Sequence, residues 1–95
     1  MIKMILEEAQ ALPDLSRRQM QFLALRAQGY TNQRIAQECY CAQKTVEHTL
    51  VNARVKLGAG NVVQAIFRAI ALEILILTAD GEVLIPERFN HLSAV

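Results

Sequence analysis

The most informative part of this chain is residues 29–58, which read GYTNQRIAQECYCAQKTVEHTLVNARVKLG. Their pattern predicts two helices joined by a tight turn. Thr31 can cap the first helix, which is short and ends near Tyr40. After a turn at residues 41–42, apolar side chains recur at i, i+4, i+7 and i+11, which predicts a longer helix over residues 42–57 with a narrow inward stripe. The stripe consists of Val46, Leu50, Ala53 and Leu57.

Helical patterns continue on both sides of this pair. Ser16, with Gln19 three residues later, forms a capping-box pattern, which predicts that a helix begins there and runs to the next glycine. Asn61 with Gln64 repeats the pattern and opens a further helix that extends to about Ile74. This last helix is apolar nearly all round, so we expect one of its two apolar stripes to meet another subunit.

The two ends of the chain add smaller elements. Apolar side chains at helical spacing predict an amphipathic helix over residues 1–13. Segments 75–78 and 82–85 flank Ala79-Asp80-Gly81, and an Asp-Gly step favours a tight hairpin turn. We therefore expect a single domain over residues 1–95 that is all-α. It would have a four-helix core at 15–74, an added N-terminal helix and a small β-hairpin within 75–95.

Composition and charge are those of a compact globule with one basic region. The 95 residues are 53% hydrophobic and 20% charged, which excludes a disordered chain. The net charge is only +1, but residues 15–68 hold eight basic and two acidic side chains. Residues 1–14 and 69–95 are both net acidic. Positive charge is thus concentrated in the middle of the chain, as a surface that contacts phosphates requires.

Several classes of protein are disfavoured. Glu7 and Glu8 interrupt any signal-peptide core, and no apolar run approaches the roughly 20 residues of a membrane span, so we expect a cytoplasmic protein without membrane contact. Cys39 and Cys41 are two apart, a spacing that poorly suits a disulfide, and we expect reduced, packed thiols. A zinc site formed by these cysteines and the two histidines is disfavoured, because the sequence has no second cysteine pair at metal-binding spacing. The sequence also contains no phosphate-binding loop and no nucleophile motif. We therefore expect that the chain is not an enzyme and that it binds no metal, cofactor or small-molecule ligand.

A series of short motifs carries a resemblance to a known family. In order, they are Leu15-Ser16-x-Arg18, Phe22-Leu23-x-Leu25, Gly29-x-Thr31-Asn32-x-x-Ile35-Ala36, Lys44-Thr45-Val46, and Lys56-Leu57-Gly58 with Asn61 and Ala65 beyond. At these spacings residues 15–70 resemble the DNA-binding domain of LuxR-type (GerE-like) bacterial transcription regulators. The resemblance implies a four-helix domain in a bacterial or phage setting, with the third helix as reader and the fourth commonly used for dimerisation.

The sequence departs from this family at four positions. Gln19 stands where the family usually has Glu, and Thr49 replaces a common His. Val62 replaces a common Arg, and Ala42 replaces the usual Ser cap of the reading helix. Loss of that cap leaves amide groups less satisfied, at a typical cost of about 1 kcal/mol.

The outward side of the helix over residues 42–57 is the expected DNA-reading surface. Because base edges are contacted mainly by the N-terminal part of such a helix, we expect Glu47, His48 and Val51 to read bases. Glu47 is the difficult member, since a carboxylate facing DNA lowers affinity unless a cytosine amine pairs with it. The expected phosphate contacts are Thr31, Asn32, Gln33, Lys44, Thr45, Arg54 and Lys56.

The expected function is a stand-alone, sequence-specific DNA-binding transcription regulator that binds double-stranded DNA as a homodimer. The expected dimer interface consists of Phe67, Ala71, Ile74, Leu75 and Leu77. The hairpin and residues 1–12 would stabilise the dimer, so that removing residues 75–95 would leave a monomer. An alternative is a protein-interaction module that pairs with a larger regulator or with RNA polymerase. A promoter reader similar to a sigma factor would share the fold and would also bind the polymerase.

Overall fold

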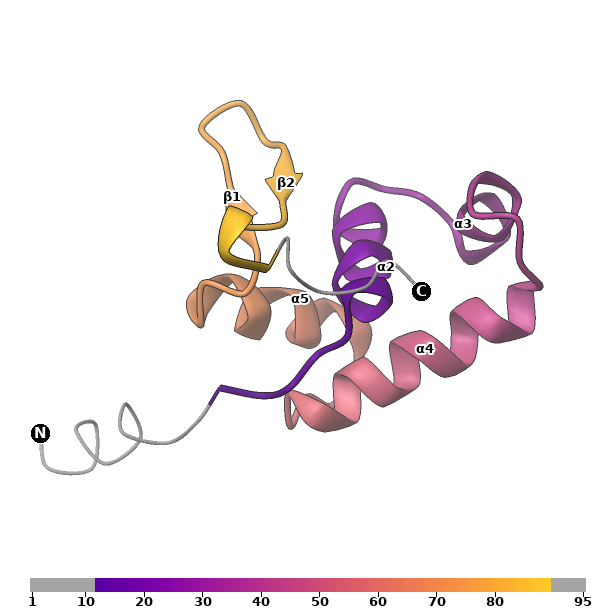
Figure 1. Ribbon diagram of the computed structural model, residues 1–95, viewed down its shortest axis with the longest axis horizontal. Helices are drawn as coiled ribbons and strands as arrows, with labels where there is room; N and C mark the ends of the chain where they lie inside the picture. Colours follow the sequence, from indigo (N-terminus) through magenta and orange to yellow (C-terminus); the bar gives the residue numbers. More distant parts are fainter. Residues whose placement is uncertain (1–11, 90–95) are drawn as a thin grey trace, which may run out of the picture.

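The computed structural model describes residues 12–89, which form four α-helices and a small hairpin (Figure 1). The elements are α2 (Arg17–Ala27), α3 (Asn32–Glu38), α4 (Gln43–Lys56), α5 (Val62–Ala71), β1 (Ile76–Leu77), β2 (Val83–Leu84) and a 3₁₀ turn (Glu87–Phe89). The predicted all-α class with a C-terminal hairpin is confirmed. The predicted N-terminal helix falls almost entirely outside the described residues.

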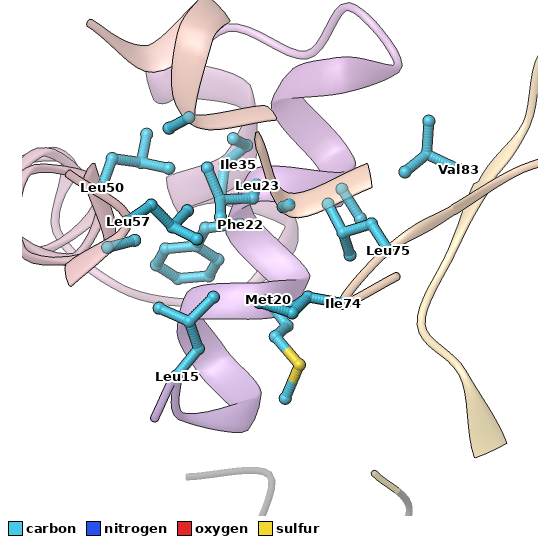
Figure 2. Close-up of a cluster of buried hydrophobic side chains, with 14 of the residues drawn as sticks. Leu15, Met20, Phe22, Leu23, Ile35, Leu50, Leu57, Ile74, Leu75 and Val83 are labelled. Atoms are coloured by element: carbon cyan, nitrogen blue, oxygen red, sulfur yellow. The ribbon is translucent and has the colours of Figure 1, made fainter. Parts of the chain in front are cut away.

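Helix α2 lies at the centre and packs against α3, α4, α5 and β2. Its side chains Met20, Phe22 and Leu23 are fully buried. Figure 2 shows them surrounded by side chains from the other elements, including Leu50 and Leu57 of the α4 segment. Helix α4 faces this core with the stripe predicted from the sequence, because Val46, Leu50, Ala53 and Leu57 are all buried. Its opposite side is therefore turned to solvent.

The predicted helix starts are confirmed for all four helices, and three of them have the side-chain cap that the sequence predicts. The Ser16 hydroxyl accepts a hydrogen bond from the amide of Gln19, whose side chain accepts one from the amide of Ser16. Thr31 and Asn61 cap α3 and α5 in the simpler way, by accepting from the amide three residues later. Ala42 occupies the N-cap of α4 and offers no side-chain acceptor.

Left-handed residues end the helices around the turns. Gly29 (φ 97°) follows α2 and Gly58 (φ 66°) follows α4, as the sequence predicts. The α3–α4 turn instead uses Tyr40, with φ 55°, and leaves its side chain 95% exposed. The Cys41 amide then donates to the carbonyl of Ala36, which closes the end of α3. A tyrosine at this position gave no signal of a left-handed turn in the sequence.

Helix α5 ends at Ala71, three residues before the predicted Ile74. Glu73 adopts φ 60°, and the amides of Ile74 and Leu75 both donate to the carbonyl of Ala69. This reversal drives Ile74 and Leu75 into the core, where each is only 1% exposed. The prediction that these two side chains lie in a dimer interface is therefore wrong, because the monomer itself buries them.

The hairpin is shorter than predicted and belongs to the core. Ile76 pairs with Leu84 and Leu77 with Val83, and Gly81 (φ 90°) lies in the turn. Val83 is buried on the side that meets α2. Removing residues 75–95 would therefore strip Leu75 and Val83 from the core, so that truncation tests folding as well as dimerisation.

Candidate nucleic-acid interface

The exposed side of α4 carries the side chains predicted to read bases. Glu47, His48 and Val51 are all exposed, as are Lys44 and Val55. Within residues 12–89, no other helix or strand covers these side chains. This placement follows directly from the buried stripe, because residues opposite an inward stripe must point outward.

The first turns of α3 and α4 hold most of the predicted phosphate contacts. These two helix starts lie toward one end of the domain, and the hairpin lies toward the other (Figure 1). Thr31 and Gln33 are exposed and Asn32 is half-buried, while Lys44 and Thr45 are exposed at the start of α4. Since Ala42 provides no cap, the first amides of α4 have no side-chain acceptor. A helix start of this kind suits an anionic partner.

The remaining two predicted phosphate contacts are tied to the protein's own backbone. Arg54 is half-buried and donates from Nη1 to the carbonyl of Ala59 at 3.0 Å. Lys56 donates from Nζ to the carbonyl of Asp14 at 2.8 Å and to Oε1 of Gln19 at 3.2 Å. Lys56 thus joins the end of α4 to the start of α2.

An open depression of about 370 Å³ lies beside the exposed face of α4. Four helices contribute to it: the end of α2, the start of α3, the middle of α4 and the start of α5. Its polar lining consists of Arg26, Asn32, Glu47, Arg54 and Asn61. Arg26 and Asn61 were absent from the residues predicted to form the site. The available signal was a single basic residue inside the apolar run of α2, where a guanidinium needs polar partners.

The outer side of α5 forms a second exposed surface. Phe67 is 68% exposed and Val63 is 59% exposed, and Ala71 lies exposed on the same helix. Leu77 of the hairpin is exposed as well. Of the predicted dimer residues, Phe67, Ala71 and Leu77 are therefore accessible to a second molecule.

The cysteines and histidines give no metal site in residues 12–89. Cys39 and Cys41 are free and half-buried, and burial raises the pKa of the Cys39 thiol. Within these residues no group of three or more His, Cys, Asp or Glu side chains could hold a metal ion. No helix in the same part of the chain is long and apolar enough to cross a membrane. His91 lies outside the described residues.

Comparison with known proteins places the chain in a family. The sequence model of the family "Bacterial regulatory proteins, luxR family" matches residues 13–69. No curated protein matches the chain. Among solved structures, the phage VqmA–DPO complex is similar, with 27% sequence identity and a TM-score of 0.59. The match covers 75% of this chain and 33% of the VqmA chain, so this chain spans about a third of that protein's length. The chain belongs to the LuxR family of bacterial regulatory proteins, and its fold is the DNA-binding helix-turn-helix domain of that family.

Proposed function

We propose that this chain is a sequence-specific, homodimeric transcription regulator that places α4 in the major groove of double-stranded DNA. The observation that carries the proposal is the exposure of Glu47, His48 and Val51 on one side of a helix whose other side is buried. Membership in the LuxR family supports it. A bacterial regulator of this kind acts on DNA in the cytoplasm and needs no catalytic group.

The exposed side chains have chemistry suited to base edges. A glutamate accepts a hydrogen bond from the cytosine amine, and an apolar side chain such as valine contacts the thymine methyl group. A histidine can donate to the acceptor atoms of a purine. Glu47, His48 and Val51 therefore offer a different type of contact at each position. This variety favours a reader of sequence over a binder of DNA in general.

Phosphate contacts would hold α4 in register. We assign this role to Thr31, Asn32 and Gln33 at the start of α3 and to Lys44 and Thr45 at the start of α4. Arg54 belongs to the same set. Lys56 has the weakest support, because its ammonium group already has two partners within the protein.

We assign the homodimer contact to the exposed side of α5. Phe67 and Ala71 would form its centre, with Leu77 of the hairpin at its edge. A two-fold dimer would present two copies of α4, and half-sites would then be spaced by about one helical turn of DNA or a multiple of it. Exposed apolar side chains near one another mark surfaces that associate with proteins.

The test is selection of bound fragments from random DNA by the purified protein. We expect enriched fragments with paired half-sites, and an affinity for them that falls steeply with salt concentration. Fragments with no shared sequence would contradict a role in specific recognition. The exposed apolar side of α5 also favours a second candidate, a module that pairs with a larger regulator or RNA polymerase. Weak DNA binding together with tight binding to such a protein would support this second candidate.

A further inference from the structure

Arg26 lies in the depression beside α4 with part of its guanidinium group already fixed. Its Nη1 donates to the carbonyl of Tyr30 at 3.1 Å. Its Nε is buried and has no hydrogen-bond partner among the described residues. An arginine has five N–H donors, so one bond to the backbone orients the group and leaves donors for a ligand. Holding an arginine in this way reduces the entropy that binding would otherwise cost.

Arg54 lines the same depression and is held in the same manner. Its Nη1 donates to the carbonyl of Ala59. The two arginines come from different helices, α2 and α4, and each is tied to the loop that follows its own helix. Paired guanidinium groups suit the oxygens of a phosphate group, which accept several charged hydrogen bonds at once.

Two further groups in the lining favour a polar, anionic ligand. Oδ1 of Asn32 is buried without a partner, and rotating this amide by half a turn would present its NH₂ group instead. The α5 helix, ten residues long, begins at the depression with Asn61 and Val62. The N-terminus of a helix carries a partial positive charge. The carboxylate of Glu47 also lines the depression and would repel an anion. The titratable side chains of the lining are therefore two arginines and one glutamate.

We propose that this depression receives a phosphate group of the DNA backbone, and that Arg26 is a further phosphate-contacting residue acting together with Arg54. The inference rests on the proposed function, because Glu47 and Val51 line the depression and also belong to the base-reading face. A phosphate held there lies next to the bases that these two side chains read. Its charge would repel the Glu47 carboxylate and keep that carboxylate directed at the base edges.

The experiment uses a duplex taken from the selection and a set of copies in which one phosphate at a time is replaced by a neutral methylphosphonate. For the wild-type protein, replacing the phosphate in the depression should lower affinity. Arg26→Gln should lower affinity by roughly tenfold on all sequences alike and reduce the salt slope by about 1. The variant should also become less sensitive to methylphosphonate at that one position, because only Arg54 would then contact the phosphate. This loss of sensitivity identifies the phosphate that Arg26 contacts.

Arg88→Gln is the matched control. Arg88 also donates from its guanidinium group to a backbone carbonyl, that of Glu73. It belongs to the 3₁₀ turn, which lies beside the hairpin (Figure 1), and it is not among the residues that line the depression. We expect its salt slope and methylphosphonate pattern to equal those of the wild type. If Arg26→Gln fails to fold, Arg26→Lys takes its place. That variant keeps the charge, so it should retain the salt slope but weaken the response at the same phosphate.

The outcomes separate this inference from the proposed function. If the wild type selects no DNA, the proposed function fails, and the inference fails with it. If the wild type binds selected DNA with a steep salt slope while the Arg26 variants keep the wild-type slope and phosphate pattern, only the inference is overturned. A tenfold loss with no change at any single phosphate would also overturn it, because that result indicates a purely structural Arg26.

Discussion

Glu47 is the residue at which the chemistry of the surface and the chemistry of DNA conflict most. Its side chain is exposed on the face of α4 that we assign to the groove, between Lys44 and Val51. Proximity to phosphates penalises a carboxylate, and only a specific donor on a base compensates for that penalty. The residue therefore either selects cytosine-containing sites or reduces affinity for every site.

Glu47→Ala distinguishes these two effects. We expect the variant to lose its preference at one base pair. The difference in binding free energy between the preferred base pair and the others at that position, about 1–3 kcal/mol, should disappear. Repeating the selection with the variant, and titrating the wild-type site and its single-base changes, measures this directly. Equal strengthening on every sequence would show that Glu47 is not a reader.

Lys56 illustrates how a surface lysine can serve the fold. Its ammonium group bridges the end of α4 to Asp14 and Gln19. We expect Lys56→Met to lower the free energy of unfolding by up to about 1 kcal/mol, because the bonds are partly exposed. The salt slope of DNA binding should stay that of the wild type. Urea unfolding measures the stability, and a salt titration of DNA binding measures the slope. A slope reduced by about 1 would show that Lys56 contacts a phosphate.

At the scale of elements, the helix starts show what a sequence can predict. A cap depends on residues within four positions of one another, so Ser16 with Gln19 and Asn61 with Gln64 identify two helix starts without any knowledge of packing. The left-handed Glu73, which ends α5 early, carries no such local signal because left-handed residues are usually glycine. The depression around Arg26 was also missed, since four helices from separate parts of the chain form it.

The uncapped start of α4 leads to a prediction about stability. Ala42 already has the extended backbone of an N-cap, with φ −74° and ψ 146°. Ala42→Ser should therefore raise the free energy of unfolding by about 1 kcal/mol, because the hydroxyl can accept from a first-turn amide. Ser16→Ala is the opposite change and should lower stability by a similar amount. Chemical unfolding of both variants checks this pair, and no gain from Ala42→Ser would show that the start of α4 needs no acceptor.

At the scale of the whole molecule, charge and shape are arranged along one axis. The starts of α3 and α4 lie toward one end, and the hairpin lies toward the other (Figure 1). Of the seven exposed acidic side chains in residues 12–89, four belong to the hairpin region: Glu73, Asp80, Glu82 and Glu87. Residues 15–68 carry the basic excess. An approaching duplex would therefore be attracted by the helix-turn-helix and repelled by the hairpin, which orients the encounter.

The same separation of surfaces allows dimerisation to be tested without touching the DNA face. Phe67→Gln removes the most exposed aromatic side chain of α5 while leaving charge and helix propensity nearly unchanged. We expect the variant to sediment as a folded monomer, and to lose most of its preference for paired over single half-sites. Ile74→Val is the control: because Ile74 is buried in the monomer, this change should cost about 0.5–1.5 kcal/mol of stability and leave the dimer intact. A Phe67→Gln protein that remains a dimer would remove α5 from the interface, and a wild type that is monomeric on its selected DNA would end the homodimer proposal altogether.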